Sequence, residues 1–222
     1  MVNLGNVLIL GDSYSTFKGF IPEGYLYYYL SEKEDDDESR LLNNVDETWW
    51  RQLIAKTGSN LVFNSSFSGS AVCNTGWTGR DSITTSFSTR FKELLDNGFF
   101  KENKIDTLFI FGGTNDSWCD APIGNLKFEN IEKEDTFNVL EGVCYLYDMV
   151  KNNLPARVIV LLNVDEVKPE ITNGYITAAE HYGFEYIKIK DLQKRAGHPD
   201  ATGMTQICDQ ILEYLENNKT QG

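Results

Sequence analysis

The sequence predicts an α/β fold in which a parallel β-sheet is covered by helices on both faces. Short apolar runs rich in β-branched residues alternate with longer segments of helical periodicity along the chain, a pattern that is typical of βαβ units. The apolar runs are nearly continuous, as expected for strands that are buried on both faces. No internal repeat or linker divides the 222 residues, so we expect one three-layer α/β/α domain over residues 1–222.

Five segments are predicted to be strands because each is short, apolar and bounded by turn residues. They are VLILGD at 7–12, LVFN at 61–64, IDTLFIFGG at 105–113, ARVIVLLN at 156–163 and FEYIKI at 184–189. Five longer segments show helical periodicity and end in polar residues or glycine. These are residues 47–57, 86–96, 135–152, 169–182 and 202–217.

The charge balance excludes two classes of partner. Asp and Glu number 33 against 20 Lys and Arg, which gives a net charge of −13. Such a chain repels phosphate backbones and anionic lipid headgroups, so we expect neither a nucleic-acid partner nor a membrane surface. No apolar run approaches the roughly 18 residues of a membrane span, and no signal peptide is visible. We therefore expect a soluble, cytoplasmic protein.

The cysteines and histidines do not form a metal motif. Four cysteines, at 73, 119, 144 and 208, are too widely spaced for CxxC, and two histidines leave a zinc site short of ligands. We expect no metal and no cofactor. Cys73 and Cys119 fall on neighbouring loops of the predicted sheet, so a disulfide between them is a hypothesis, although free thiols are favoured in the cytoplasm.

The first strand is followed by an unusually long connection. It contains aromatic residues at 25–29 and the charge run SEKEDDDE at 31–38. A solvated surface loop is the simplest interpretation. Long loops at this edge of an α/β sheet often cover a site, so a lid is the alternative.

In an open parallel sheet, ligands bind beyond the carboxyl ends of the strands. Polar residues follow four of the predicted strands at this edge. They are GDSYS at 11–15, NSSFSG at 64–69, GGTND at 112–116 and GHPD at 197–200. The predicted edge therefore gathers a hydroxyl, an imidazole and several hydrogen-bond donors.

These groups match what acyl transfer requires. A serine hydroxyl needs a base within hydrogen-bond reach, and a tetrahedral intermediate needs donors aimed at its oxygen. Ser13 and His198 can supply the first pair; the N–H groups of Ser13 and Gly69 and the amide of Asn115 can supply the donors. Taken singly, each residue has a simpler interpretation as a turn residue or a helix cap.

Four ordered blocks resemble the SGNH, or GDSL, hydrolase family. They are Gly11-Asp12-Ser13, Gly69, Gly113-Thr114-Asn115-Asp116 and His198. The resemblance implies a flavodoxin-like sandwich with strand order 2-1-3-4-5 and a serine hydrolase acting on esters, including acyl or acetyl groups on sugars and lipids. Carried over, Ser13 is the nucleophile, His198 the base, and Ser13, Gly69 and Asn115 the oxyanion donors. The α/β-hydrolase elbow G-x-S-x-G is absent, which disfavours that family.

One position departs from the family pattern. The family places an Asp three residues before the His, where this chain has Arg195. Asp191 is further upstream, Asp200 is expected to cap the last helix, and a backbone carbonyl could hold the imidazole instead. The third member of the constellation therefore stays open. His181, the competing base, falls at the end of a helix, where a positive charge is stabilised.

Aromatic residues bear on the substrate. Trp49 and Trp50 open an apolar helix and are expected in the core, whereas Trp77, Trp118 and Tyr14 are expected to line the cleft. Indole rings pack well against sugars. We therefore expect an esterase for small acyl esters, with an O-acetylated carbohydrate as one such substrate. The alternative is a non-catalytic domain that binds a sugar or an anion on the same scaffold, since fold alone does not fix function.

Overall fold

Five parallel strands form the central sheet, in the order β2-β1-β3-β4-β5. They are β1 (Asn6–Gly11), β2 (Asn60–Ser66), β3 (Thr107–Phe111), β4 (Arg157–Asn163) and β5 (Glu185–Ile189). The computed structural model describes residues 2–31, 41–77 and 81–218, so most of the acidic run at 31–38 lies outside the described residues. The strand order confirms the predicted flavodoxin-like fold, and each strand end lies within one or two residues of its predicted place.

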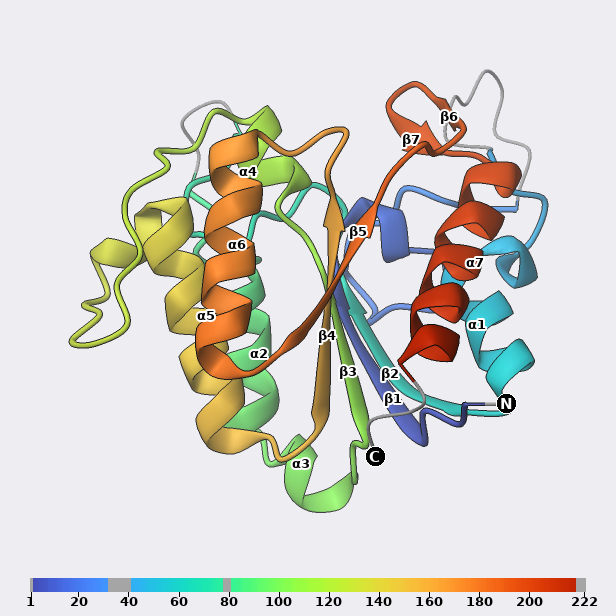
Figure 1. Ribbon diagram of the computed structural model, residues 1–222, viewed down its shortest axis with the longest axis horizontal. Helices are drawn as coiled ribbons and strands as arrows, with labels where there is room; N and C mark the ends of the chain where they lie inside the picture. Colours follow the sequence, from blue (N-terminus) through green and yellow to red (C-terminus); the bar gives the residue numbers. More distant parts are fainter. Residues whose placement is uncertain (1, 32–40, 78–80, 219–222) are drawn as a thin grey trace.

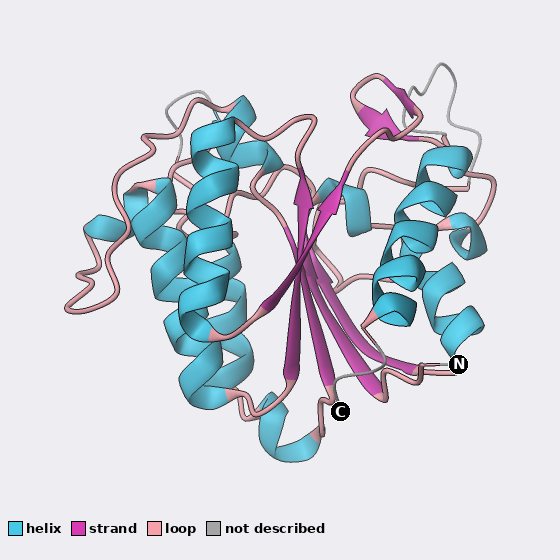
Figure 2. Ribbon diagram, viewed as in Figure 1, coloured by secondary structure: helices cyan, strands magenta, loops and turns pink. Residues whose placement is uncertain are grey.

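Helices cover both faces of the sheet, which gives the three layers of the prediction (Figures 1 and 2). On one face lie α1 (Trp49–Thr57) and α7 (Ala201–Asn217); on the other lie α2 (Phe87–Asp96), α5 (Val139–Asn153) and α6 (Pro169–Tyr182). Two short helices, α3 (Phe99–Glu102) and α4 (Thr114–Trp118), were not predicted. No helix in the described part of the chain is long and apolar enough to cross a bilayer.

The long predicted helix at 135–152 is divided. Residues Asp135–Phe137 form a separate 3-10 turn, and α5 begins only at Val139. Asn138 between them has φ −94° and ψ 149°, an extended conformation that interrupts the helical hydrogen bonds. Periodicity alone does not reveal such a break, because the apolar pattern runs through it.

Polar caps fix the ends of the helices that flank the sheet. Thr48 caps α1 by accepting a hydrogen bond from the N–H of Arg51, and Gly58 ends the helix in a left-handed conformation. Asp200 caps α7 by accepting from the N–H of Gly203 at 3.0 Å, which confirms the predicted cap. His198 lies two residues before this cap and three before the first residue of α7.

The sheet separates two apolar cores. One lies under α2, α5 and α6, and the other lies under α1 and α7, where Trp49 and Trp50 are buried as predicted. In the sheet, Gly11 at the end of β1 pairs with Ser66 of β2 and with Phe111 of β3. The carboxyl ends of these three strands are therefore level, and the loops that follow them meet at one edge.

Candidate active site

The fold brings Ser13 and His198 together from opposite ends of the chain. Ser13 begins a 3-10 turn (Ser13–Ser15) directly after β1, and His198 lies in the small hairpin formed by β6 (Lys194–Arg195) and β7 (His198–Pro199). The Nε2 atom of His198 lies 2.9 Å from the Oγ atom of Ser13. Only 4% of Ser13 and 8% of His198 are exposed, so this hydrogen bond is shielded from water.

Buried side chains from the core hold the turn that carries Ser13 by hydrogen bonds to Ser15. The indole of Trp49 donates to Ser15 Oγ at 3.2 Å, and the indole of Trp50 donates to Ser15 O at 3.1 Å. The side-chain amide of Asn64 donates to the same carbonyl at 2.9 Å. Buried donors of this kind need acceptors, so the two tryptophans fix the turn as well as filling the core.

Within the described residues, His198 has a backbone carbonyl, and no carboxylate, at its second ring nitrogen. Nδ1 lies 3.2 Å from the carbonyl oxygen of Ala196. A carbonyl can only accept, so Nδ1 carries the proton and the lone pair of Nε2 faces Ser13. Arg195 stands opposite His198 in the hairpin and is exposed, and Asp200 caps α7. The sequence left open whether Asp191, Asp200 or a backbone carbonyl holds the imidazole, and in the structure the group at Nδ1 is the Ala196 carbonyl.

The environment of His198 favours the neutral ring. Burial is the main cause that lowers its pKa, and the nearby Glu166 carboxylate opposes this shift in part. Tyr28, from the long connection after β1, stacks on the ring face with centroids 3.5 Å apart. Sequence reasoning did not identify Tyr28 as a site residue, because nothing in the aromatic run at 25–29 distinguishes it.

Three candidate hydrogen-bond donors lie in the loops that follow the adjacent strands β1, β2 and β3. Within the described residues, the N–H groups of Ser13 and Gly69 have no acceptor. Gly69 has φ +80°, which L side chains rarely adopt, and the space where a Cβ would stand is open. Asn115 lies in the first turn of α4, and its Nδ2 is 3.5 Å from Asp12 Oδ2.

A model of the GDSL-like lipase/acylhydrolase family matches residues 5–215. The chain belongs to this family. A solved structure from Bacteroides uniformis ATCC 8492, described as a GDSL-like lipase, is 37% identical with a TM-score of 0.85, and covers 96% of each chain. Another from Bacteroides ovatus ATCC 8483, described in the same way, is 34% identical with a TM-score of 0.87, and covers 97% of this chain and 99% of its own.

More distant structures share the fold of this GDSL-like chain. A carbohydrate acetylesterase from Sinorhizobium meliloti is 16% identical with a TM-score of 0.58, and covers 96% of this chain and 99% of its own. At this identity the likeness concerns the fold alone. A search of curated proteins found no match.

The fourth residue of the Gly113-Thr114-Asn115-Asp116 block holds the Gly69 loop of this GDSL-like fold. The buried carboxylate of Asp116 accepts hydrogen bonds from the N–H groups of Val72 and Cys73 at 2.9–3.1 Å. Burial raises the pKa of Asp116, and these backbone donors work against that shift. Asp116 therefore ties the loop after β2 to the loop after β3.

Arg90 supports the same loop from α2. Its fully buried guanidinium donates to the carbonyl oxygens of Gly11 (3.0 Å), Thr85 (2.9 Å) and Ser65, and to Ser70 Oγ (3.1 Å). Burial lowers its pKa to about 10, so it stays charged at neutral pH. The sequence did not reveal this role, because three of the four acceptors lie 20 or more residues from Arg90 along the chain.

Two indole rings lie beside the Ser13–His198 pair. Trp77 is 40% exposed, and its centroid lies 6.5 Å from that of Trp118. Trp118 stands edge-on to His198 at 5.9 Å, and its Nε1 donates to Glu166 Oε2 at 3.2 Å. Both predicted cleft tryptophans are therefore near the pair.

Tyr14 has a different role from the predicted one. The sequence placed it on the cleft wall, but the side chain is completely buried. Its hydroxyl donates to the carbonyl oxygen of Gly197 at 2.7 Å. The 3-10 turn points Tyr14 into the interior, so it supports the His198 hairpin instead of facing a substrate.

The remaining candidates lie apart from the pair. His181 is in the last turn of α6, where it stacks on Phe128 with centroids 3.9 Å apart. All four cysteines are free thiols, so the hypothesis of a Cys73–Cys119 disulfide is wrong. In the described part of the chain, no three His, Cys, Asp or Glu side chains gather as metal ligands.

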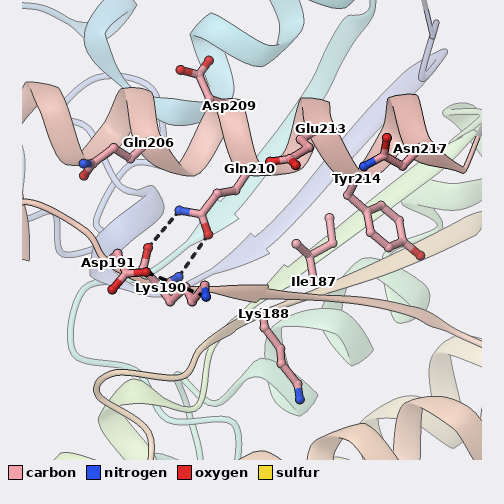
Figure 3. A pocket seen from close by; sticks show the side chains of 10 residues that line it. All are labelled: Ile187, Lys188, Lys190, Asp191, Gln206, Asp209, Gln210, Glu213, Tyr214 and Asn217. Carbon is pink, nitrogen blue, oxygen red and sulfur yellow. Dashed lines mark hydrogen bonds and ion pairs between the residues drawn. The ribbon is translucent and has the colours of Figure 1, made fainter.

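A separate groove runs between β5 and α7 (Figure 3). Gln210 of α7 bridges it by accepting from the N–H of Lys190 at 3.1 Å and donating to the carbonyl of Lys190 at 2.9 Å. Most of the side chains that line the groove are amides or carry a positive or a negative charge. It contains none of the predicted site residues.

Proposed function

We propose that the protein is a carboxylic ester hydrolase that uses Ser13 as nucleophile and His198 as general base and acid. The observation that carries the proposal is the 2.9 Å contact between His198 Nε2 and Ser13 Oγ. A serine hydroxyl becomes an effective nucleophile only when a base can take its proton during attack. The neutral, buried imidazole described above is such a base.

The reaction proceeds in two halves. Ser13 Oγ attacks the ester carbonyl while its proton moves to His198 Nε2. The tetrahedral oxyanion accepts hydrogen bonds from the N–H groups of Ser13 and Gly69 and from the Asn115 amide. Collapse expels the alcohol, which takes the proton from His198, and leaves an acyl-serine. A water molecule then gives its proton to His198 and attacks the acyl group. As the acid leaves, His198 returns that proton to Ser13 Oγ, which restores both residues.

Ser13 and His198 form a dyad, and the backbone carbonyl of Ala196 lies where a triad has its acidic side chain. The Ala196 oxygen accepts from Nδ1 at 3.2 Å, which keeps the proton on Nδ1 in the ground state. When Nε2 is protonated, the same carbonyl dipole and the Glu166 carboxylate stabilise the imidazolium.

We propose a small acyl group, such as acetyl, and a carbohydrate as the alcohol. Ser13 is almost fully buried, which favours short acyl chains, and the exposed Trp77 with Trp118 offers indole faces to a sugar ring. The net charge of −13 favours neutral substrates over anionic ones such as nucleic acids.

Hydrolysis of p-nitrophenyl acetate by the wild type, Ser13→Ala and His198→Ala tests the proposal. We expect kcat/KM to fall by about 10³-fold or more in both variants. O-acetylated xylo-oligosaccharide then tests the carbohydrate class through acetate release. Equal rates for the three proteins, together with binding of the sugar by calorimetry, would favour the non-catalytic binding domain instead.

A further inference from the structure

We propose that Tyr28 is a positioning residue for His198 and supplies ring alignment that an acidic partner supplies in a Ser-His-Asp triad. The inference rests on the proposed function and concerns the same site. It starts from one observation: among the residues that the structure describes, the His198 ring has a single backbone carbonyl at Nδ1 and a tyrosine ring stacked on its face.

The stack is parallel and close. The Tyr28 and His198 centroids are 3.5 Å apart and the ring planes differ by 9°. Three other aromatic rings contact His198 at steep angles, with planes at 56–77° and centroids 5.4–6.4 Å away. They are Tyr14, Trp118 and Tyr29. Among the described residues, Tyr28 is therefore the ring that fixes the plane of the imidazole.

Other contacts hold the backbone around His198 but leave its ring free to turn. The hydroxyl of Tyr14 donates to Gly197 O at 2.7 Å, and the hydroxyl of Tyr29 donates to Pro199 O at 2.9 Å. These bonds fix the chain on both sides of His198. The Ala196 carbonyl and Ser13 Oγ meet the ring at its two nitrogens, and two hydrogen bonds in the ring plane still allow the ring to rotate about the line that joins them. The stack opposes that rotation.

The backbone of Tyr28 is also tied to the turn of Ser13. The N–H of Tyr28 donates to Thr16 Oγ1 at 2.8 Å, and the Thr16 hydroxyl donates to the carbonyl of Ser13 at 3.0 Å. Thr16 is fully buried, so water does not compete for these bonds. Tyr28 thus touches His198 through its ring and the Ser13 turn through its backbone. It spans the two partners of the 2.9 Å hydrogen bond.

The stack also suits the charge that develops during the reaction. When His198 takes the Ser13 proton it becomes an imidazolium, and the electron-rich face of a tyrosine attracts a cation. A carboxylate provides the same kind of stabilisation in a triad. Tyr28 therefore acts both on the orientation of the ring and on its charged form.

The test compares Tyr28→Leu, Tyr28→Phe and Tyr27→Leu with the wild type on p-nitrophenyl acetate. Leu removes the aromatic ring, and Phe keeps it without the hydroxyl. Tyr27 is the matched control, because its ring lies near Lys18 (5.6 Å) and is exposed. We expect kcat to fall about tenfold in Tyr28→Leu, with KM changed less than about twofold, since loss of alignment acts on the chemical step. Phe and the Tyr27 control should stay within about twofold of wild type.

The outcomes separate this inference from the proposed function. If wild type and Ser13→Ala hydrolyse the ester equally, the proposed function fails. If hydrolysis depends on Ser13 but Tyr28→Leu keeps its kcat, or changes only KM, the positioning role is wrong while the function stands. Equal losses in Tyr28→Leu and Tyr28→Phe would assign the effect to the hydroxyl and also overturn the inference. Tyr28→Met replaces Leu if circular dichroism shows that the Leu variant does not fold.

Discussion

The indole Nε1 of Trp77 donates a hydrogen bond to the side-chain oxygen of Asn115 at 3.2 Å. With Oδ1 engaged in this way, the Asn115 amide directs its Nδ2 toward Asp12, 3.5 Å away, on the Ser13 side of the site. The amide thus has one orientation, set by a tryptophan that comes from the loop after β2. A donor that is already oriented needs no rearrangement when an oxyanion forms.

Replacing Asn115 with Ala is expected to lower kcat on p-nitrophenyl acetate by about 100-fold or more, because one oxyanion donor is lost. KM should change little, since the donor acts mainly in the transition state. Asn153→Ala, at an exposed position late in α5, is the control. Unchanged turnover in Asn115→Ala would leave Asn115 a structural residue of α4.

The pH dependence of kcat/KM is expected to show an acid limb that belongs to His198. Burial lowers the pKa of this imidazole, and the base must be neutral to accept a proton. Activity should therefore rise with pH through an apparent pKa below about 6.5 and level off near neutrality. A rate profile from pH 4 to 8 with a neutral ester measures it. An acid limb centred above the ordinary histidine pKa of 6.5 would contradict the lowering of the His198 pKa by burial.

Loss of the Asp116 carboxylate is expected to destabilise the fold. Asp116→Ala leaves the buried N–H groups of Val72 and Cys73 without an acceptor, which costs about 3 kcal/mol in the free energy of unfolding. Asp96→Ala removes an exposed ion pair with Lys92 and should cost less than about 0.5 kcal/mol. Urea denaturation of both variants measures the difference. Equal free energies of unfolding for Asp116→Ala and Asp96→Ala would show that the hydrogen bonds to Asp116 do not stabilise the fold.

Asp12 is expected to make stability fall as pH rises from about 4 to about 7. Burial raises its pKa from 3.8 in the unfolded chain to about 7 in the fold. In this window the folded protein holds a proton that the unfolded chain has lost, so raising the pH favours unfolding. The carboxyl group is absent from Asp12→Asn, which should therefore show a smaller slope than wild type across this range. Chemical denaturation at several pH values compares the two slopes, and identical slopes would contradict the shift.

The parts of the fold that sequence predicted best are those that depend on local patterns. Strand ends, the cap at Asp200 and the burial of Trp49 and Trp50 follow from apolar periodicity and capping chemistry, and all are confirmed. The gathering of residues 13, 69, 115 and 198 at one edge follows from a topological rule for parallel sheets. The order of these blocks along the chain therefore carried most of the information about the site.

What sequence did not predict depends on contacts between distant segments. Tyr14 was misplaced because its direction is set by the 3-10 turn after Asp12, which alternation along a strand does not anticipate. The Ala196 carbonyl could not be chosen over Asp191 or Asp200 without the geometry of the β6–β7 hairpin. Arg90 and Tyr28 reach the site from segments with no motif of their own.

Labelling with a fluorophosphonate, followed by mass analysis of the intact protein and its peptides, shows directly whether Ser13 is the nucleophile. We expect one covalent adduct on Ser13 in the wild type, none in Ser13→Ala, and strongly slowed labelling in His198→Ala. An adduct on another residue, or labelling of Ser13→Ala at the wild-type rate, would contradict it.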